Sequence, residues 1–125
     1  MQEFKSLGVG TDIEDISRFR KINREKDSIF LNKIFTEKEL DYSFSTTKSY
    51  QHLAARYAGK EAVVKALSSV GKKSINYKDI EILNNDNGVP KVSLNNDDFN
   101  GLNITISLSH SDDRALAFAV IVKNE

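Results

Sequence analysis

The chain has 125 residues, of which 39% are hydrophobic, and this size suits one compact domain over residues 1–125. Its 18 basic and 18 acidic residues cancel, so no global basic field favours nucleic-acid binding. The chain contains no cysteine, which excludes disulfides and thiolate metal sites. Neither a signal peptide nor a bilayer-spanning stretch is visible, so we expect a soluble cytoplasmic protein that binds no membrane.

The N-terminal segment alternates in a way that predicts a strand. Leu7 and Val9 fall on one side of it, and Gly8, Gly10 and Asp12 fall on the other. Glycines inside a strand usually mark a bulge, or the close approach of another backbone or a ligand.

Helical signals follow the first strand. Residues 14–26 have helical spacing of their apolar side chains, and residues 28–35 predict a short apolar helix. Thr36 followed by Glu39 is the start signature of a further helix over residues 36–44.

The longest predicted helix covers residues 53–70 and ends near Gly71. One of its stripes combines small and charged residues: Ala54, Ala58, Glu61 and Lys65. A neighbouring stripe has the character of a core: Leu53, Tyr57, Val64 and Leu67. Alanines beside Glu61 and Lys65 leave room for something to come close. The alternative is a solvated Glu–Lys pair, which stabilises a helix by only about 0.2–0.5 kcal/mol.

The C-terminal half changes from helical to alternating spacing. Four strands are predicted, over residues 79–83, 89–94, 104–110 and 115–123. Asn87-Gly88 is a hairpin signal because both residues tolerate positive φ, and Pro90 suggests an edge strand. The order of elements predicts an α+β fold with a largely antiparallel sheet, helices packed on one face, and one long central helix.

Two carboxylates stand out as candidate metal ligands. Asp12 could simply be a turn or helix-capping residue. If the first strand packs on the long helix, however, Asp12 and Glu61 could converge. Two carboxylates with open coordination positions suit Mg²⁺ with substrate phosphate oxygens, and Lys65 would add a cation at the same phosphate.

Histidine occurs twice. His110 ends the third of the predicted C-terminal strands, between Ser109 and Ser111, where ligand-facing groups often collect, although a lone histidine is more often structural. His52 has no such setting, and we assign it no role.

Several motifs in this order resemble one family over nearly the whole chain. They are GVGTDIEDISRF, FTEKEL, LAARYAGKEAVVKAL, DIEILNNDNGVPKV and ISLSHSDDRALAFAV. The family is that of the acyl-carrier-protein synthases, the small bacterial 4′-phosphopantetheinyl transferases.

The resemblance implies an enzyme of fatty acid biosynthesis. It would transfer the 4′-phosphopantetheine group of coenzyme A to a serine of apo acyl carrier protein and release adenosine 3′,5′-bisphosphate. The family needs Mg²⁺ and typically forms homotrimers with active sites at subunit interfaces.

The resemblance also implies roles for individual residues. Asp12 and Glu61 match the metal ligands, and Lys65 matches the active-site lysine, so these three are the expected catalytic residues. The expected coenzyme A contacts are Arg56, Lys65, Gly88, Pro90 and His110. The proton of the serine would pass to Glu61 or to a metal-bound water that Glu61 orients, and the sequence does not choose between them.

A basic flank is the expected docking surface for the acidic carrier protein. Arg18, Lys21 and Arg24 recur at three-residue spacing, and Arg18 matches a basic residue on the helix that receives the carrier in the family. A solvated basic face is the alternative from spacing alone. One departure from the family is Gly59, where alanine is usual, which would loosen the long helix by up to about 1 kcal/mol.

Three other functions are alternatives. A non-catalytic module that binds coenzyme A or a carrier protein would not need both Asp12 and Glu61. A domain detached from a larger synthase, or a broad-range transferase for polyketide and peptide carriers, fits the short length less well.

Overall fold

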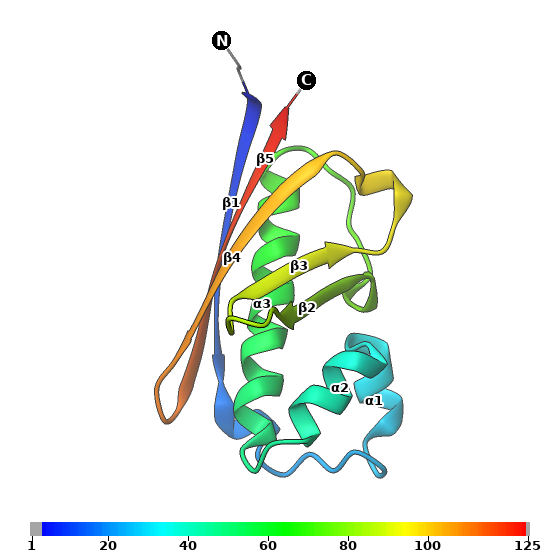
Figure 1. Ribbon diagram of the computed structural model, residues 1–125, viewed down its shortest axis with the longest axis vertical. Coiled ribbons are helices and arrows are strands. Elements are labelled where there is room, and N and C mark those ends of the chain that lie inside the picture. Colours follow the sequence, from blue (N-terminus) through cyan, green and yellow to red (C-terminus); the bar gives the residue numbers. More distant parts are fainter. Residues whose placement is uncertain (1–3, 125) are drawn as a thin grey trace.

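The computed structural model describes residues 4–124, and it has the expected α+β architecture with one long helix (Figure 1). The five strands are β1 (Phe4–Asp15), β2 (Ile80–Asn84), β3 (Pro90–Leu94), β4 (Leu102–His110) and β5 (Arg114–Asn124). The three α-helices are α1 (Ser28–Ile34), α2 (Glu37–Phe44) and α3 (Ser49–Ser69). Three short 3₁₀ turns connect them, η1 (Ile16–Phe19), η2 (Tyr77–Asp79) and η3 (Asp97–Phe99).

Two antiparallel sheets share helix α3. The larger sheet has the order β1-β5-β4, and β2 and β3 form a separate hairpin. Helix α3 runs along one face of the larger sheet, with the hairpin beside it and α1 and α2 at its N-terminal end (Figure 1). The prediction of helices on one face of an antiparallel sheet is confirmed.

The glycines of β1 allow this strand to lie directly on the backbone of α3. A Cβ atom added to Gly10 would lie 2.7 Å from the backbone nitrogen of Ala66 and closer still to the carbonyl oxygen of Ala62. Gly8 meets the next turn, at Ala66 and beyond, so strand and helix run in opposite directions. The approaching group foreseen for these glycines is therefore the backbone of α3.

This packing decides where Asp12 lies. Two strand residues advance about 6.6 Å and one helical turn about 5.4 Å, so each alternate residue of β1 meets roughly the next turn of α3. Gly10 lies at Ala62, so Asp12 lies about one turn nearer the start of the helix, level with Ala58, and its carboxylate meets the Lys65 side chain.

The helix predicted over residues 14–26 is wrong. Strand β1 continues to Asp15, paired with Arg114, and only the short turn η1 follows. Beyond it, the Asn23 side chain accepts hydrogen bonds from the backbone of Glu25 and Lys26, both at 3.0 Å. Asparagine that bonds the local backbone in this way competes with helix formation, so the segment turns instead.

The remaining helix signals are confirmed. Thr36 and Glu39 form the reciprocal capping box at the start of α2. Helix α3 begins four residues before the predicted start, and Gly71, with φ of 76°, ends it. The amide of Gly71 bonds the Ser68 carbonyl and that of Lys72 bonds the Leu67 carbonyl, which is a Schellman motif.

Charged side chains unexpectedly occupy the buried side of α3. Lys60 and Glu39 are fully buried and 2.8 Å apart, and Lys60 also donates to the carbonyls of Tyr77 and Ile80. Glu39 accepts from the amide of Ile82 at 2.8 Å, so β2 is attached to both helices. Burial lowers the pKa of Lys60, and the adjacent Glu39 carboxylate opposes that change.

The hairpin turn differs in detail from the prediction. Only Gly88, with φ of 79°, has positive φ, and Asn87 does not. The Asn85 side chain instead accepts from the amides of Asn87 and Val89, at 2.9 and 3.0 Å. The loop is thus longer than the two-residue turn that Asn-Gly usually makes.

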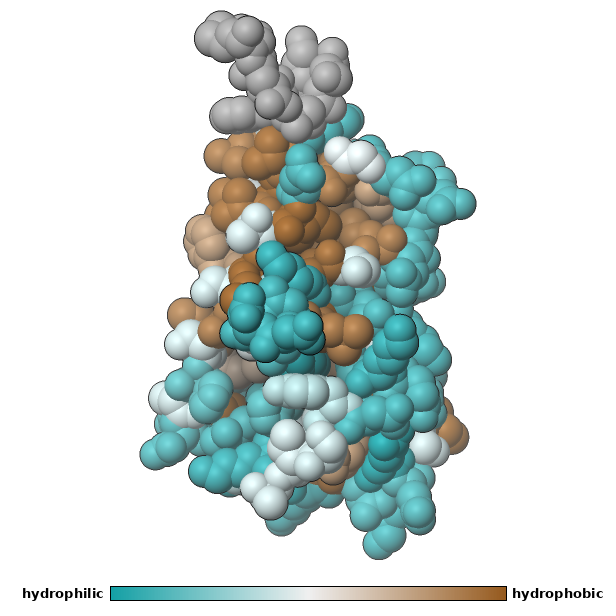
Figure 2. Space-filling model, viewed as in Figure 1, coloured by the Kyte–Doolittle hydropathy of each residue, from teal (hydrophilic) through white to brown (hydrophobic). Residues whose placement is uncertain are grey.

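The sheet face that points away from α3 carries exposed apolar side chains on β1 and β5. These are Leu7, Val9, Ile13, Leu116 and Phe118, each between 44% and 61% exposed. Figure 2 shows apolar side chains gathered over the sheet in the upper part of the molecule, whereas hydrophilic ones cover the helical end.

No helix within residues 4–124 is long and apolar enough to cross a bilayer.

Two glycine substitutions test the packing of α3. We expect Gly10→Ala to lower the free energy of unfolding by about 3 kcal/mol, because the new methyl group meets backbone that cannot move aside. Gly59→Ala is the matched control, since its methyl group would lie 2.6 Å from the flexible end of Ile82. There the gain in helix propensity, up to about 1 kcal/mol, offsets the crowding and leaves stability within about 1 kcal/mol of the parent. Urea unfolding of both variants measures these changes. Equal losses of unfolding free energy in the two variants would contradict the close approach of β1 to α3.

Candidate active site

One cluster of charged groups lies where β1 crosses α3. The Asp12 carboxylate is 3.1 Å from the Lys65 ammonium group, which also donates to the Thr11 carbonyl at 2.9 Å. The second carboxylate oxygen of Asp12 is buried and accepts no hydrogen bond. A buried carboxylate oxygen without a partner is costly, and a bound cation would satisfy it.

Glu61 lies on the same side of α3, one turn before Lys65. Its carboxylate accepts a hydrogen bond from the Tyr77 hydroxyl. Tyr57, one turn before Glu61, has its ring centroid 5.9 Å from that of Tyr77. Lys60 holds the Tyr77 carbonyl, so the buried ion pair of α3 also positions the tyrosine that contacts Glu61.

The two predicted metal ligands act on the same neighbour. Burial and then the hydrogen bond and charge of Glu61 raise the pKa of Tyr77, and the charge of Asp12 adds to them. Asp12 also pairs with Lys65, one turn beyond Glu61 on α3, so both carboxylates lie near the same flank of the helix, and a metal ion shared between them is still a prediction. Within residues 4–124 no group of three or more histidine, aspartate or glutamate side chains is arranged to hold a metal. A cation bound by these two carboxylates would need further oxygen ligands from water or substrate, as Mg²⁺ commonly does.

A third acidic group, Glu14, was missed in the sequence. It follows Asp12 by two residues and shares its face of β1, so a longer predicted strand would have found it. Burial and the adjacent Asp12 raise the pKa of Glu14, and Arg18, 2.5 Å away, opposes this. The crowded carboxylates make the site electrostatically strained when no cation is bound.

A second cluster forms a cleft of about 170 Å³ between α3, the β2–β3 hairpin and the end of β4. It is lined by Gln51, His52, Ala55, Arg56, Asn84, Gly88, Pro90, Leu108 and His110. Four predicted coenzyme A contacts, Arg56, Gly88, Pro90 and His110, thus meet in one place. His52, which received no role, lies among them.

Arg56 is the fixed cation of this cleft. It is only 2% exposed, its Nε donates to the Ile82 carbonyl at 3.1 Å, and its guanidinium stacks on the Tyr42 ring at 4.5 Å. Its Nη2 group is buried and has no hydrogen-bond partner. A buried donor of this kind, with no carboxylate lining the cleft, suits an anionic ligand.

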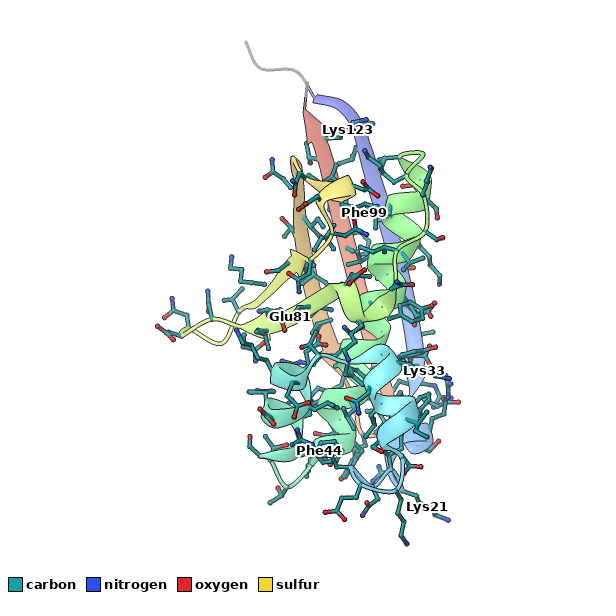
Figure 3. The ribbon with its side chains drawn as sticks, turned by 90° about the vertical axis from the view of Figure 1, so that its right-hand side faces the viewer. Lys21, Lys33, Phe44, Glu81, Phe99 and Lys123 are labelled. Atoms are coloured by element: carbon teal, nitrogen blue, oxygen red, sulfur yellow. The ribbon has the colours of Figure 1, made fainter. Side chains whose placement is uncertain are left out.

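The three predicted docking residues do not share a helix flank. Arg18 is paired with Glu14, and Arg24 is paired with Glu37 and Asp41, at 2.9 and 2.6 Å. Among the described residues Lys21 makes no ion pair, and Figure 3 shows it extending from the lower end of the molecule. The spacing argument for a docking helix therefore fails, although a docking role is still a prediction.

Comparison with known proteins gives the family. Residues 8–119 match the model of the 4′-phosphopantetheinyl transferase superfamily. The chain belongs to this superfamily. A holo-[acyl-carrier-protein] synthase of Thermodesulfovibrio yellowstonii is 47% identical over 116 residues, which cover 91% of this chain and 96% of that protein. A synthase of Chlamydia felis is 46% identical over 115 residues, which cover 90% of this chain and 93% of that protein.

Solved structures agree with these relatives. The complex of a Chronobacterium ammoniagenes synthase with coenzyme A has a TM-score of 0.80 at 25% identity and covers 97% of this chain and all of that one. A Bacillus anthracis synthase in complex with coenzyme A (3′,5′-ADP) has a TM-score of 0.73 at 26% identity, and covers 94% and 96%. The curated relatives are enzymes, and so is this chain, which argues against the alternative of a non-catalytic binding module.

The strain among the carboxylates can be tested with Asp12→Asn. We expect this variant, without metal, to be more stable than the parent by about 1 kcal/mol, because the loss of a buried negative charge and of its repulsion of Glu14 outweighs the loss of the ion pair with the half-exposed Lys65. Adding Mg²⁺ to the coenzyme A complex should raise the Tm of the parent and leave that of the variant unchanged, because only ligands that bind the folded state stabilise it. A variant that is less stable in EDTA, or equally stabilised by Mg²⁺, would contradict this assignment.

Proposed function

We propose that this transferase moves the 4′-phosphopantetheine group of coenzyme A onto a serine of apo acyl carrier protein and releases adenosine 3′,5′-bisphosphate. The observation that carries the proposal is the position of a basic cleft and a carboxylate cluster along one helix. Arg56 and Glu61 are five residues apart on α3, an axial rise of about 7.5 Å. A nucleotide with phosphate groups on both sides of its ribose could place one in the cleft and the other on a cation held by the carboxylates.

The proposed reaction is a phosphoryl-group transfer. The serine oxygen attacks the β-phosphorus of coenzyme A, the bond to the bridging oxygen breaks, and the bisphosphate leaves with that oxygen. Because both reactants and the leaving group are anionic, the protein contributes mostly position and positive charge. Mg²⁺ held by Asp12 and Glu61 would neutralise the pyrophosphate oxygens when it is bound.

The chain's own residues would supply the other parts. Lys65 is 53% exposed on a flexible stem, so its ammonium group can turn from Asp12 to the leaving phosphate. Tyr77 holds the Glu61 carboxylate in place. Glu61 is also the candidate acceptor of the serine proton. Arg56 and His110 would receive the 3′-phosphate in the cleft.

We propose further that the active chain is a homotrimer whose sites lie between subunits. The cleft of about 170 Å³ is smaller than the roughly 300–1,000 Å³ of pockets that enclose whole ligands, so one chain would cover only part of coenzyme A. The apolar sheet face of β1 and β5 offers the surface for association. Equilibrium sedimentation should give three times the chain mass, and a monomer at micromolar concentration would contradict the assembly. Roles in the cytoplasm and in fatty acid biosynthesis remain predictions.

The reaction is tested by mass spectrometry. We expect the protein, with coenzyme A and Mg²⁺, to add one phosphopantetheine to an apo acyl carrier protein, and none when the acceptor serine is replaced by alanine. Glu61→Gln should lower kcat by at least about 100-fold, since it removes a metal ligand and the candidate base. An unmodified carrier under saturating conditions would refute the proposed function.

Carrier docking can be tested by charge reversal. We expect Lys21→Glu to raise KM for the carrier several-fold at low salt, because Lys21 is the unpaired cation of the three predicted docking residues. Lys123→Glu makes the same change at the opposite end of the molecule and serves as the control (Figure 3). The difference should vanish near 1 M salt, where the Debye length is about 3 Å. If both variants have the parent KM, the docking surface lies elsewhere.

A further inference from the structure

The cleft contains one basic side chain more than the proposed function uses. His52 precedes Arg56 by four residues on α3, so both side chains lie on the same face of the helix and both line the cleft. His110 reaches the cleft from the end of β4. Two imidazoles and one guanidinium therefore surround a space of about 170 Å³, which is ample for a phosphate group.

An aromatic contact fixes His52. Its ring meets that of Tyr42 edge-on, with centroids 5.2 Å apart and planes at 85°. Tyr42 also carries the stacked guanidinium of Arg56, and its hydroxyl accepts from the Asn84 side chain at 3.2 Å. The same tyrosine thus orients both basic side chains toward the cleft and ties them to the hairpin.

The surroundings of His52 disfavour its charged form in the free protein. Burial lowers the pKa of His52 first, followed by the charge of Arg56 and then that of His110. From α2, the titratable group that contacts His52 is Tyr42. The hairpin residues that line the cleft, Asn84, Gly88 and Pro90, carry no charge. No carboxylate among these lining residues stabilises the imidazolium.

A phosphate monoester would reverse this balance. It carries a charge of about −1.5 to −2 at pH 7, with a second pKa near 6. Within the cleft such a group would attract a proton to the imidazole and accept its hydrogen bond, as charge-assisted pairs do.

We propose that His52 is a third phosphate-contacting residue of the cleft, and that it takes up a proton from solvent when the 3′-phosphate of the nucleotide enters. The inference rests on the proposed function, and it adds selectivity for nucleotides that carry this phosphate. Because protonation accompanies binding, affinity is highest below the pKa of His52 in the free protein and is lost as the pH rises through its higher pKa in the complex.

Calorimetry with adenosine 3′,5′-bisphosphate tests the proposal. Titrations near pH 7 in two buffers of different ionisation enthalpy give the number of protons taken up on binding. We expect net uptake by the parent and a smaller uptake by His52→Phe, which keeps a ring against Tyr42 but cannot be protonated. The variant should bind the bisphosphate about tenfold more weakly, the usual effect of losing one charge-assisted hydrogen bond.

Adenosine 5′-monophosphate, which lacks the 3′-phosphate, is the matched probe. Its affinity should be equal for the parent and His52→Phe, because His52 has no phosphate to contact. His52→Gln, a second variant, should recover part of the affinity for the bisphosphate but none of the proton uptake.

Three results would overturn the inference. Equal losses of affinity for the two nucleotides would make His52 a structural residue only. Parent-like proton uptake in His52→Phe would assign the proton to another group, such as His110. If the parent modifies a carrier protein but His52→Phe binds the bisphosphate as tightly as the parent does, the inference about His52 is wrong and the proposed function stands. If the parent neither binds the bisphosphate nor modifies a carrier protein, both are refuted.

Discussion

The contact between β1 and α3, made without side chains on the strand, is the constraint on which the site depends. Gly10 lies so close to Ala62 that a single methyl group has no space. This approach brings the carboxylate of Asp12 within 3.1 Å of the Lys65 ammonium group, one turn beyond Glu61. Ordinary side chains on the strand would hold it away from the helix and separate Asp12 from this flank of α3.

A buried ion pair fixes the other side of the same helix. Glu39 and Lys60 are fully buried and bond the backbone on either side of the start of β2. Removing one partner of such a pair commonly costs about 3–5 kcal/mol, because a buried charge is left alone. The pair also positions Tyr77 beside Glu61, and Arg56 bonds the Ile82 carbonyl of β2. One helix therefore orders the acidic cluster on one flank and the anionic-ligand cleft on another.

The parts of the fold that follow from local pattern were predictable. Alternation gave the five strands, Thr36 with Glu39 gave the start of α2, and Gly71 gave the end of α3. Apolar spacing over residues 14–26 gave a helix that does not form, because the pairing of β1 with β5 and the bonds of Asn23 take that backbone. These competing interactions are non-local or geometric, so the spacing of residues does not reveal them.

For the site, the sequence predicted which residues belong to it better than it predicted what surrounds them. The family motifs selected Asp12, Glu61 and Arg56, and the structure brings them to the two clusters. Helical spacing placed Lys65 beside Glu61, but nothing in the sequence predicted that Lys60 is buried, because its partner Glu39 comes from another helix. Glu14 was passed over because the first strand was predicted too short, and His52 because its neighbours Tyr42 and His110 come from other elements of the chain.

The most direct measurement is anomalous diffraction at the manganese edge from crystals grown with Mn²⁺ and coenzyme A. The account predicts one peak between Asp12 and Glu61, about 2.1 Å from an oxygen of each, the distance typical of a small hard cation. A strong peak elsewhere, or an occupied coenzyme A site with no metal between these carboxylates, would contradict it.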